Sequence, residues 1–231
     1  AGNIGKPALE ILPRIKRTSW VVLELSSFQL QDLPYSPHIA VVLDTFPEHL
    51  DHHKSLREYY GSKANIARWQ RSSDSVFYFG DNPESERIAT KGKGKRIKVL
   101  TKGFSLFQEG DLKIKGTHNF KNAVMAATVA LRLGVPKATI ARAVKNFRGM
   151  EHRLEFVRKI RNVSFYNDSA STNPHTAAAA IKAFPHEPVI LIAGGRDKVR
   201  DHAPLIRALK KYPPKFVILF GENKNKIAKA I

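Results

Sequence analysis

The chain has 231 residues, and its 39 lysines and arginines against 20 aspartates and glutamates give a formal net charge of +19. A hydrophobic content of 42% is sufficient for a buried core and excludes intrinsic disorder. The longest apolar runs, at 189–195 and 216–221, are far shorter than the roughly 20 residues of a membrane-spanning helix, so we expect no membrane insertion. The sequence contains no cysteine, which excludes disulfides, cysteine-based zinc sites and thiol nucleophiles.

Short apolar runs alternate with helical patterns along the chain, which is typical of parallel βαβ units. A long helix is expected at 117–133, where Gly134 ends it. The i, i+4, i+7 spacing of Ile140, Val144 and Phe147 predicts a second helix. Before these helices, the pattern predicts strands at 20–25, 39–43 and 75–79, a helix at 56–71, and hairpins at a sheet edge within 91–114.

The alternation of strands and helices restarts after the FRGMEHR segment, so we place a domain boundary near Gly149. The two predicted domains, 1–149 and 150–231, are both of the α/β class. In the second domain the pattern predicts strands at 155–157, 163–167, 189–193 and 216–220, and helices at 174–184, at 204–212 and from about Glu222.

Polar side chains gather where the first two predicted strands end. In LELSSFQLQ at 23–31, Glu24 lies in an apolar run, and because a buried carboxylate needs a partner we expect a metal ion or another cation nearby, with an arginine as the alternative. DTFPEHLDHH at 44–53 combines carboxylates with three histidines, and one histidine with carboxylates and phosphates suits Mg²⁺. The alternative is a polar loop that caps the next helix, which we favour for His52 and His53.

Two further segments lie on predicted helices. Lys63 lies partly on the apolar face of helix 56–71, where a lone lysine is usually a surface residue. Asn119 and Asn122 share one face at the start of the long helix, and two amides there can read a purine edge. N-capping by Thr117 or Asn119 is the alternative.

The last two polar segments follow strands of the second predicted domain. NDSASTNPHT runs into a helix with Asn173 as its cap and Pro174 at its first position, an arrangement that favours anion binding. AGGRDK brings Arg196 and Lys198 close to the end of the next strand. Together, at adjacent strand ends, the two segments predict a site for a negatively charged ligand.

Seven segments occur in the order found in Mur ligases, and they read LELSSFQLQ, PEHLDHH, SKANI with Lys63, GTHNFKNAVMAA, FRGMEHRLE, NDSASTNP and GGRDK. The chain resembles this family from GNIG at 2–5 to GEN at 221–223, and ELSSFQL is most similar to the branch that adds D-glutamate to UDP-N-acetylmuramoyl-L-alanine. The resemblance implies an ATP-binding central domain with a mostly parallel sheet, helices and a small β edge. A Rossmann-like C-terminal domain that binds the amino acid would follow.

The resemblance implies a reaction in which ATP, with Mg²⁺, phosphorylates the carboxylate of the UDP-linked substrate and D-glutamate attacks the acyl phosphate. It further implies a cytoplasmic, monomeric enzyme of peptidoglycan precursor synthesis, with Lys63, His49 and Arg153 as catalytic residues. By position, the resemblance places Glu24, His49 and a carbamylated Lys63 on Mg²⁺. It places the nucleotide against four residues, with Asn119 and Asn122 at adenine, Arg153 at the phosphates and Asp168 at the ribose. D-glutamate would contact Thr172 and Lys198, and the UDP-sugar substrate would lie beside Asn3, Ser26, Ser27 and Gln29.

The sequence also departs from the family pattern. The family's GTNGK(S/T) phosphate loop, its N-terminal UDP-binding domain and the end of its last domain are not among the 231 residues. We therefore expect a fragment with little activity on its own. Ala170 stands where the family frequently has a lysine, which puts one cationic contact in question.

Two alternatives remain open at this point. The run at 91–102 contains six lysines and arginines, which is compatible with a nucleic-acid-binding module. It lacks the interleaved aromatic residues that stack on bases, so we expect only salt-sensitive association and no specific nucleic acid partner. The second alternative is a ligase of the same superfamily that adds another amino acid.

Overall fold

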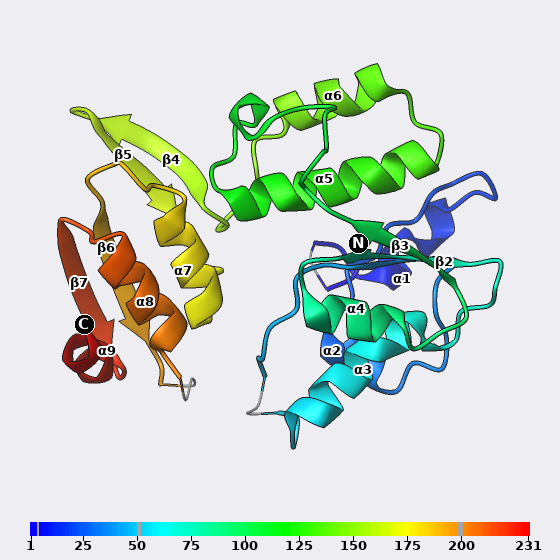
Figure 1. Ribbon diagram of the computed structural model, residues 1–231, viewed down its shortest axis with the longest axis horizontal. Helices are drawn as coiled ribbons and strands as arrows, with labels where there is room; N and C mark the ends of the chain where they lie inside the picture. The colour runs from blue at the N-terminus through cyan, green and yellow to red at the C-terminus, as the bar shows by residue number, and fades with distance from the viewer. Residues whose placement is uncertain (4, 50–51, 198–200) are drawn as a thin grey trace. The chain divides into compact units, whose positions relative to one another are not determined.

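The structure is a computed structural model that describes residues 1–3, 5–49, 52–197 and 201–231. These residues form two compact units, Ala1–Val99 and Leu100–Ile231, and we describe each by itself (Figure 1). The predicted boundary near Gly149 lies inside the second unit, and a domain division at that point stays a prediction. Across the described ranges, no helix combines the length and the apolar character needed to cross a membrane.

A parallel sheet forms the centre of the first unit. In the order of pairing, its strands are β1 (Ile39–Val42), β2 (Ser75–Phe79) and β3 (Lys95–Val99). The helix α3 (Leu56–Arg68) connects β1 to β2, and α4 (Pro83–Ala89) connects β2 to β3. Figure 1 shows α3 and α4 on one face of this sheet, with α2 (Ser27–Gln31) packed against α3. The predicted strands 39–43 and 75–79 and the helix 56–71 are confirmed, apart from shifts at their ends.

The central strand β2 is buried on both faces, as expected for a strand inside a parallel sheet, whereas Val41 on the other face of β1 is 38% exposed. Alternate residues of β1 and β2 face the helices and form the core, and its buried members are Ala40, Val42, Ala67, Val76, Tyr78, Ile88 and Ala89. Phe77 and Phe79, which point to the other face of β2, are fully buried too.

The strand predicted at 20–25 is wrong. Only Glu24 pairs with another segment, through an isolated parallel bridge to Gly2. Trp20 and Val22 are 72% and 82% exposed. A strand needs a neighbour that satisfies its backbone N–H and C=O groups, and within the described ranges the one β-bridge of this segment is to Gly2, which belongs to no strand.

The hairpins predicted in 91–114 are also wrong. Residues 95–99 form β3, which pairs in parallel with β2 at the edge of the sheet. The N–H of Lys93 donates to the Gln70 carbonyl (3.2 Å) and thereby ties this stretch to the end of α3. Five short helices in the described ranges were not predicted from the sequence, namely α1 (Ala8–Ile11), α2, α4 and the 3₁₀ helices η1 (Leu12–Arg14) and η2 (Glu109–Asp111).

The second unit follows the predicted order of elements. In chain order these are α5 (Thr117–Arg132), α6 (Lys137–Asn146), β4 (Glu155–Ile160), β5 (Val163–Asn167), α7 (Pro174–Lys182), β6 (Ile190–Gly195), α8 (Ala203–Lys211), β7 (Phe216–Gly221) and α9 (Lys224–Ala230). The helices and strands predicted between 117 and 231 are thus confirmed, with ends shifted by a few residues. β4 and β5 form an antiparallel hairpin, whose turn places Arg161 and Asn162 at positive φ, as a type I′ turn requires.

A second parallel pair, β6 and β7, supports the core of this unit. Figure 1 shows α7 and α8 side by side against this pair. Ile181 from α7 and Leu205 and Leu209 from α8 are almost fully buried, and partly buried Leu191 and Val217 of the strands pack against them.

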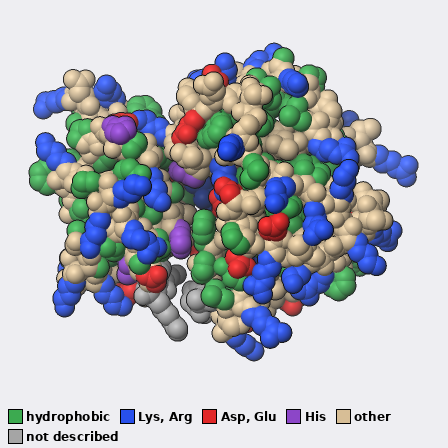
Figure 2. Space-filling model, viewed as in Figure 1, with side chains coloured by type: hydrophobic (Ala, Val, Ile, Leu, Met, Phe, Trp, Pro, Cys, Tyr) green, Lys and Arg blue, Asp and Glu red, His purple; other side chains and the backbone are tan. Residues whose placement is uncertain are grey.

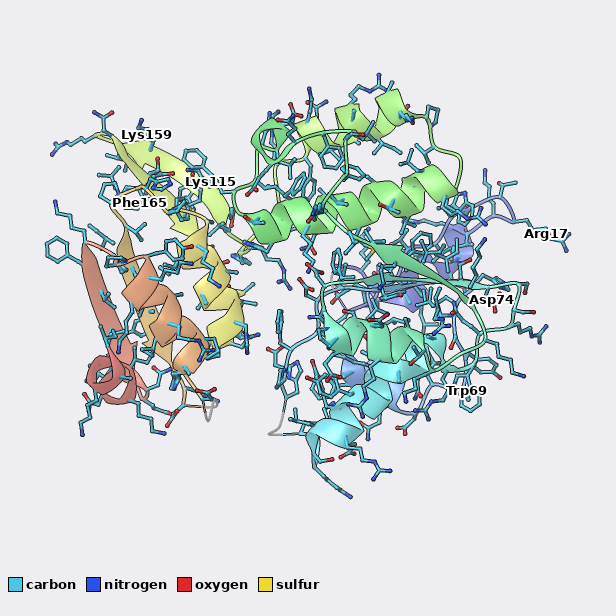
Figure 3. All side chains as sticks on the ribbon, in the orientation of Figure 1. Arg17, Trp69, Asp74, Lys115, Lys159 and Phe165 are labelled. Carbon is cyan, nitrogen blue, oxygen red and sulfur yellow. The ribbon has the colours of Figure 1, made fainter. Side chains whose placement is uncertain are left out.

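Asp74 joins the starts of the three strands of the first unit (Figure 3). Its carboxylate lies 2.8 Å from Nδ1 of His38 and accepts the N–H of Arg71 at 2.7 Å. Its carbonyl accepts the N–H of Lys95, the first residue of β3, at 2.8 Å. The hydrogen bond with His38, followed by that from Arg71, lowers the pKa of Asp74.

We predict that Asp74→Asn lowers Tm by a few degrees near neutral pH. A carboxyl whose folded pKa lies below its usual value of 3.8 stabilises the folded state above that value, and the stabilisation is lost as the pH falls through the folded pKa. The difference in Tm between the two proteins should therefore shrink below about pH 4. Circular dichroism melts across this range measure it, with Asp32→Asn as an exposed control; a constant difference would contradict the role of the charge.

Candidate active site

Residues 1–3 lie beside Glu24, in the segment before α2. The N–H of Asn3 donates to the Glu24 carbonyl at 2.8 Å, and the Asn3 side-chain amide lies 3.4 Å from the Glu24 carboxylate. Gly2 has φ +112°, and a Cβ there would lie 2.3 Å from the Glu24 carbonyl oxygen, so only glycine fits. Asn3 and Glu24 are thus neighbours in the structure, and the expectation of a buried Glu24 carboxylate is wrong, because this residue is exposed.

The next three predicted site residues start α2. Ser26 is its N-cap and forms a capping box with Gln29, in which each side chain accepts the other residue's N–H, at 3.3 and 2.9 Å. Ser27 is only 2% exposed. Ser26 and Gln29 therefore reach the surface from a fixed turn, whereas Ser27 lies inside the unit.

The loop after β1 folds back over α2. His49 has a positive φ of 58°, a strained conformation for a residue other than glycine, and its carbonyl accepts the N–H groups of His52 and His53 at 3.1 and 2.9 Å. Phe28 contacts all three of these imidazoles, with ring centroids 4.9, 4.5 and 5.5 Å away. The capping role expected for His52 and His53 is wrong, because Ser55 caps α3.

The start of this loop is held by α4. The N-cap of α4, Asn82, accepts the Ser85 N–H at 2.9 Å and donates to the Thr45 carbonyl at 3.4 Å. The Ser85 hydroxyl donates to the Leu43 carbonyl at 2.5 Å. Sequence reasoning missed both side chains, although Asn82-Pro83 at a strand end is a recognisable helix start.

Lys63 on α3 turns inward toward these segments. Burial lowers the pKa of its amine, and the carboxylates of Glu48 and Glu24 partly offset that effect. Its Nζ lies 5.1 Å from the centroid of the Tyr59 ring, and burial raises the pKa of that tyrosine. Lys63 is half-buried, and the structure brings Glu24, Glu48 and Lys63 into one electrostatic neighbourhood.

The second unit carries a separate group of predicted residues. Asp168 follows β5, and its carboxylate accepts the N–H of Leu154 at 2.8 Å. The backbone carbonyl of His152 accepts the Ala170 N–H at 3.0 Å. Nδ1 of the His152 ring lies 2.8 Å from the side-chain amide nitrogen of Asn167. These bonds join the EHR and NDS segments. Arg153, which lies between the bonded residues, is exposed.

The start of α5 belongs to the same unit. The N-cap position is Gly116, without a side-chain cap, so the proposed capping by Thr117 or Asn119 is wrong. Asn119 donates instead to the Lys115 carbonyl at 2.8 Å, and Asn122 is exposed. Lys115 forms an ion pair with Glu187 beyond α7 (Figure 3).

His118, which sequence reasoning passed over, lies beside the two asparagines. Burial lowers the pKa of its ring, and the carboxylates of Asp168 and Glu109 partly offset this. The start of α5 and the end of β5 therefore lie in one electrostatic neighbourhood. The sequence signal for His118 was its position in the GTHNFKN segment, next to Asn119 and close to Asn122.

The remaining predicted residues lie at the starts of loops in the second unit. Asn173 caps α7 as predicted, accepting the N–H groups of His175 and Thr176 at 3.0 Å each. Thr172, just before it, is exposed, as is Arg196 in the loop that follows β6. Lys198 lies outside the described residues.

Lysine and arginine side chains are spread over the visible face of the molecule and are not confined to one element (Figure 2). In the basic run, the residues at 95–98 lie on or beside the edge of the first sheet, where Lys98 lies 3.6 Å from Glu86. Exposed lysines on an edge strand discourage pairing with another chain, which is a structural reason for part of this charge.

Two family models match the chain. Residues 9–111 match the Mur ligase middle domain, and residues 152–231 match the domain described as "Mur ligase, glutamate ligase domain". Only 1–8 and 112–151 fall outside these matches. The predicted boundary near Gly149 falls within residues 112–151, the stretch between the two matched regions.

Curated relatives carry the name UDP-N-acetylmuramoylalanine--D-glutamate ligase. Those from Acetivibrio thermocellus and Natranaerobius thermophilus are 39% and 34% identical to the chain over its whole length, which corresponds to 53% and 54% of theirs. The relative from Clostridium acetobutylicum is 38% identical over 98% of the chain and 52% of its own length. The chain thus spans about half the length of the curated relatives it matches.

Solved structures show the same fold at lower identity. MurF from Acinetobacter baumannii matches 88% of the chain and 51% of its own, with a TM-score of 0.71 at 19% identity. MurC from Thermotoga maritima matches 90% and 52%, with a TM-score of 0.62 at 17% identity.

We predict that Asp168→Ala speeds hydrogen exchange at the Leu154 amide by about tenfold or more, because a bond to a charged acceptor is lost. Asp168→Asn should have a smaller effect, since its side-chain oxygen can still accept the N–H. Exchange followed by NMR or mass spectrometry measures both variants. Equal exchange in the wild type and the alanine variant would show that Asp168 does not hold this segment.

Proposed function

The chain belongs to the Mur ligase family, and on that basis we propose that the protein joins D-glutamate to UDP-N-acetylmuramoyl-L-alanine with consumption of ATP. The names of the curated relatives and the ELSSFQL segment support this choice of amino acid. The observation that carries the proposal is the group of Glu24, Glu48, His49 and Lys63 in the first unit, because phosphoryl transfer between anions needs such a place for a divalent cation.

The proposed reaction proceeds in two steps. The substrate carboxylate attacks the γ-phosphorus of ATP, which releases ADP and leaves an acyl phosphate. The amine of D-glutamate then attacks the acyl carbon, inorganic phosphate leaves, and the amine loses a proton. Each step gathers negative charge, so the chain must supply cations and hydrogen-bond donors around the reacting groups.

We propose that Glu24, His49 and a carbamylated Lys63 hold Mg²⁺, which when bound would neutralise charge on the phosphates. In the described ranges, no three Asp, Glu or His side chains converge closely enough to hold a metal ion by themselves. The arrangement fits Mg²⁺ once one more oxygen ligand is added, because the carboxylates of Glu48 and Glu24 act on the Lys63 amine and Mg²⁺ prefers oxygen ligands.

A carbamate on Lys63 would supply that ligand. The neutral amine attacks CO₂, an N–C bond forms, and a proton is released, so a cation becomes an anion. Only the neutral amine can react, and burial that lowers the Lys63 pKa raises the neutral fraction near pH 7. The two carboxylates would then face the metal ion in place of the lysine ammonium.

The nucleotide and the amino acid are proposed to bind through the second unit. Asn119 and Asn122 would lie against adenine, Arg153 near the phosphates and Asp168 at the ribose. The hydrogen bond that the Asp168 carboxylate accepts from the Leu154 N–H orients it, and a carboxylate can accept a hydrogen bond from a ribose hydroxyl. Thr172 and Lys198 would hold D-glutamate.

On the UDP-sugar side, Asn3, Ser26 and Gln29 are the proposed contacts. All three reach the surface, and two of them are held by the capping box. Ser27 is buried and lies 3.0 Å from a histidine ring, which favours a role inside the site for this side chain. We further propose a cytoplasmic monomer that uses no specific nucleic acid partner.

We predict that the intact protein releases phosphate from ATP in the presence of Mg²⁺ and UDP-N-acetylmuramoyl-L-alanine only when D-glutamate is added. Coupled phosphate assays with D-glutamate, L-glutamate, L-lysine and diaminopimelate measure the preference. His49→Asn tolerates the positive φ but loses the imidazole, and it should lower kcat about a hundredfold.

The matched control is His186→Ala, an exposed histidine after α7 that should leave turnover unchanged. A clear preference for another amino acid would favour the alternative function, that of a ligase of the same superfamily that adds an amino acid other than D-glutamate. Absence of ATP-dependent turnover with every amino acid would contradict the proposed function itself.

A further inference from the structure

His53 and Ser27 form a buried pair that connects two distant segments. Each residue is 2% exposed, and Nε2 of His53 lies 3.0 Å from the Ser27 hydroxyl oxygen. Nδ1 of His53 has no hydrogen-bond partner among the described residues. We assign the hydrogen of the neutral ring to Nε2, because there it can be donated to the Ser27 hydroxyl oxygen and no buried N–H is left without an acceptor.

The His53 ring is also packed from two sides. It stacks on Phe28, with an interplanar angle of 14° and centroids 5.5 Å apart, and meets Tyr59 edge to face at 5.5 Å. Its backbone N–H donates to the His49 carbonyl at 2.9 Å. The imidazole also meets the His52 ring, with centroids 5.2 Å apart, and it thus contacts the start of α2, the first turn of α3 and its own loop.

Each of these three segments carries one proposed magnesium ligand. Glu24 lies three residues before Ser27, and His49 lies four residues before His53 in the same turn. Lys63 lies one helical turn after Tyr59, with its Nζ over that ring. One side chain therefore touches every segment whose placement decides the geometry of the proposed metal site.

We infer that His53 is a positioning residue, whose bond to Ser27 sets the spacing between the segments that bear Glu24 and His49. This inference rests on the proposed function, because it concerns the same metal site. His53 is not itself offered as a ligand, since its Nε2 is engaged by Ser27 and its side chain is enclosed. Groups that orient metal ligands typically change metal affinity about 10- to 100-fold when removed.

The test uses Mn²⁺ in place of Mg²⁺ and measures its dissociation constant for the intact protein by electron paramagnetic resonance, without substrates. His53→Phe keeps the stacked ring and loses the bond, and we expect the Mn²⁺ dissociation constant to rise about tenfold or more. Ser27→Ala should have a similar effect. The double variant should be no weaker than either single variant, because the two residues share one interaction.

Two further variants make the result specific. His53→Gln can still donate to Ser27 and should recover part of the affinity. His52→Phe changes the exposed neighbour in the same loop and should leave the dissociation constant within about twofold of the wild type. Melting temperatures of all variants separate loss of metal affinity from loss of stability.

The inference is overturned if His53→Phe lowers Tm but binds Mn²⁺ like the wild type, or if the wild type binds no Mn²⁺. Amide formation is measured in parallel. For His53→Phe, we expect the factor by which kcat falls to be larger than the factor by which KM for the UDP-linked substrate rises. A protein that binds Mn²⁺ in a His53-dependent way but forms no amide would contradict the proposed function and support the positioning role.

Discussion

A lysine amine withdrawn from water and facing two carboxylates is the interaction on which the proposed site depends. Burial lowers the pKa of the Lys63 amine by disfavouring its charged form, and the carboxylates of Glu48 and Glu24 offset part of that effect. The proposed reaction gathers ATP, a UDP-sugar and glutamate, and it needs positive charge where these anions meet. If Lys63 becomes an anionic carbamate, it loses its own positive charge but can bind a divalent cation, which supplies positive charge at the same place.

The parallel sheet of the first unit explains why these groups meet. The loop that follows β1 is tied to the start of α4 through Asn82 and Ser85, so the carboxyl ends of β1 and β2 lie together. Ligands bind at this edge in open α/β sheets. The side chains that make such ties, including His53 on Ser27, are buried polar groups whose bonds must be kept because an unpaired buried donor is costly.

Much of this could be predicted from the sequence, and the failures have physical causes. Strands such as 75–79 and helices such as 117–133 were found because their patterns are strong and their partners are local or adjacent. The strand predicted at 20–25 failed because a strand also needs a neighbour, which periodicity does not reveal. His53 was assigned to a capping loop because its partner, Ser27, lies 26 residues away. Contacts of that kind are set by tertiary packing and leave no local signal.

The central claim is that Lys63 becomes a carboxylate-bearing ligand, and the most direct measurement is ¹³C NMR of the intact protein equilibrated with ¹³C-bicarbonate. The account predicts a carbamate resonance in the wild type that is absent from Lys63→Arg, whose guanidinium stays charged. Acid should abolish the resonance, since it protonates the amine and releases CO₂. A wild-type protein that forms amide without any such resonance would contradict the account.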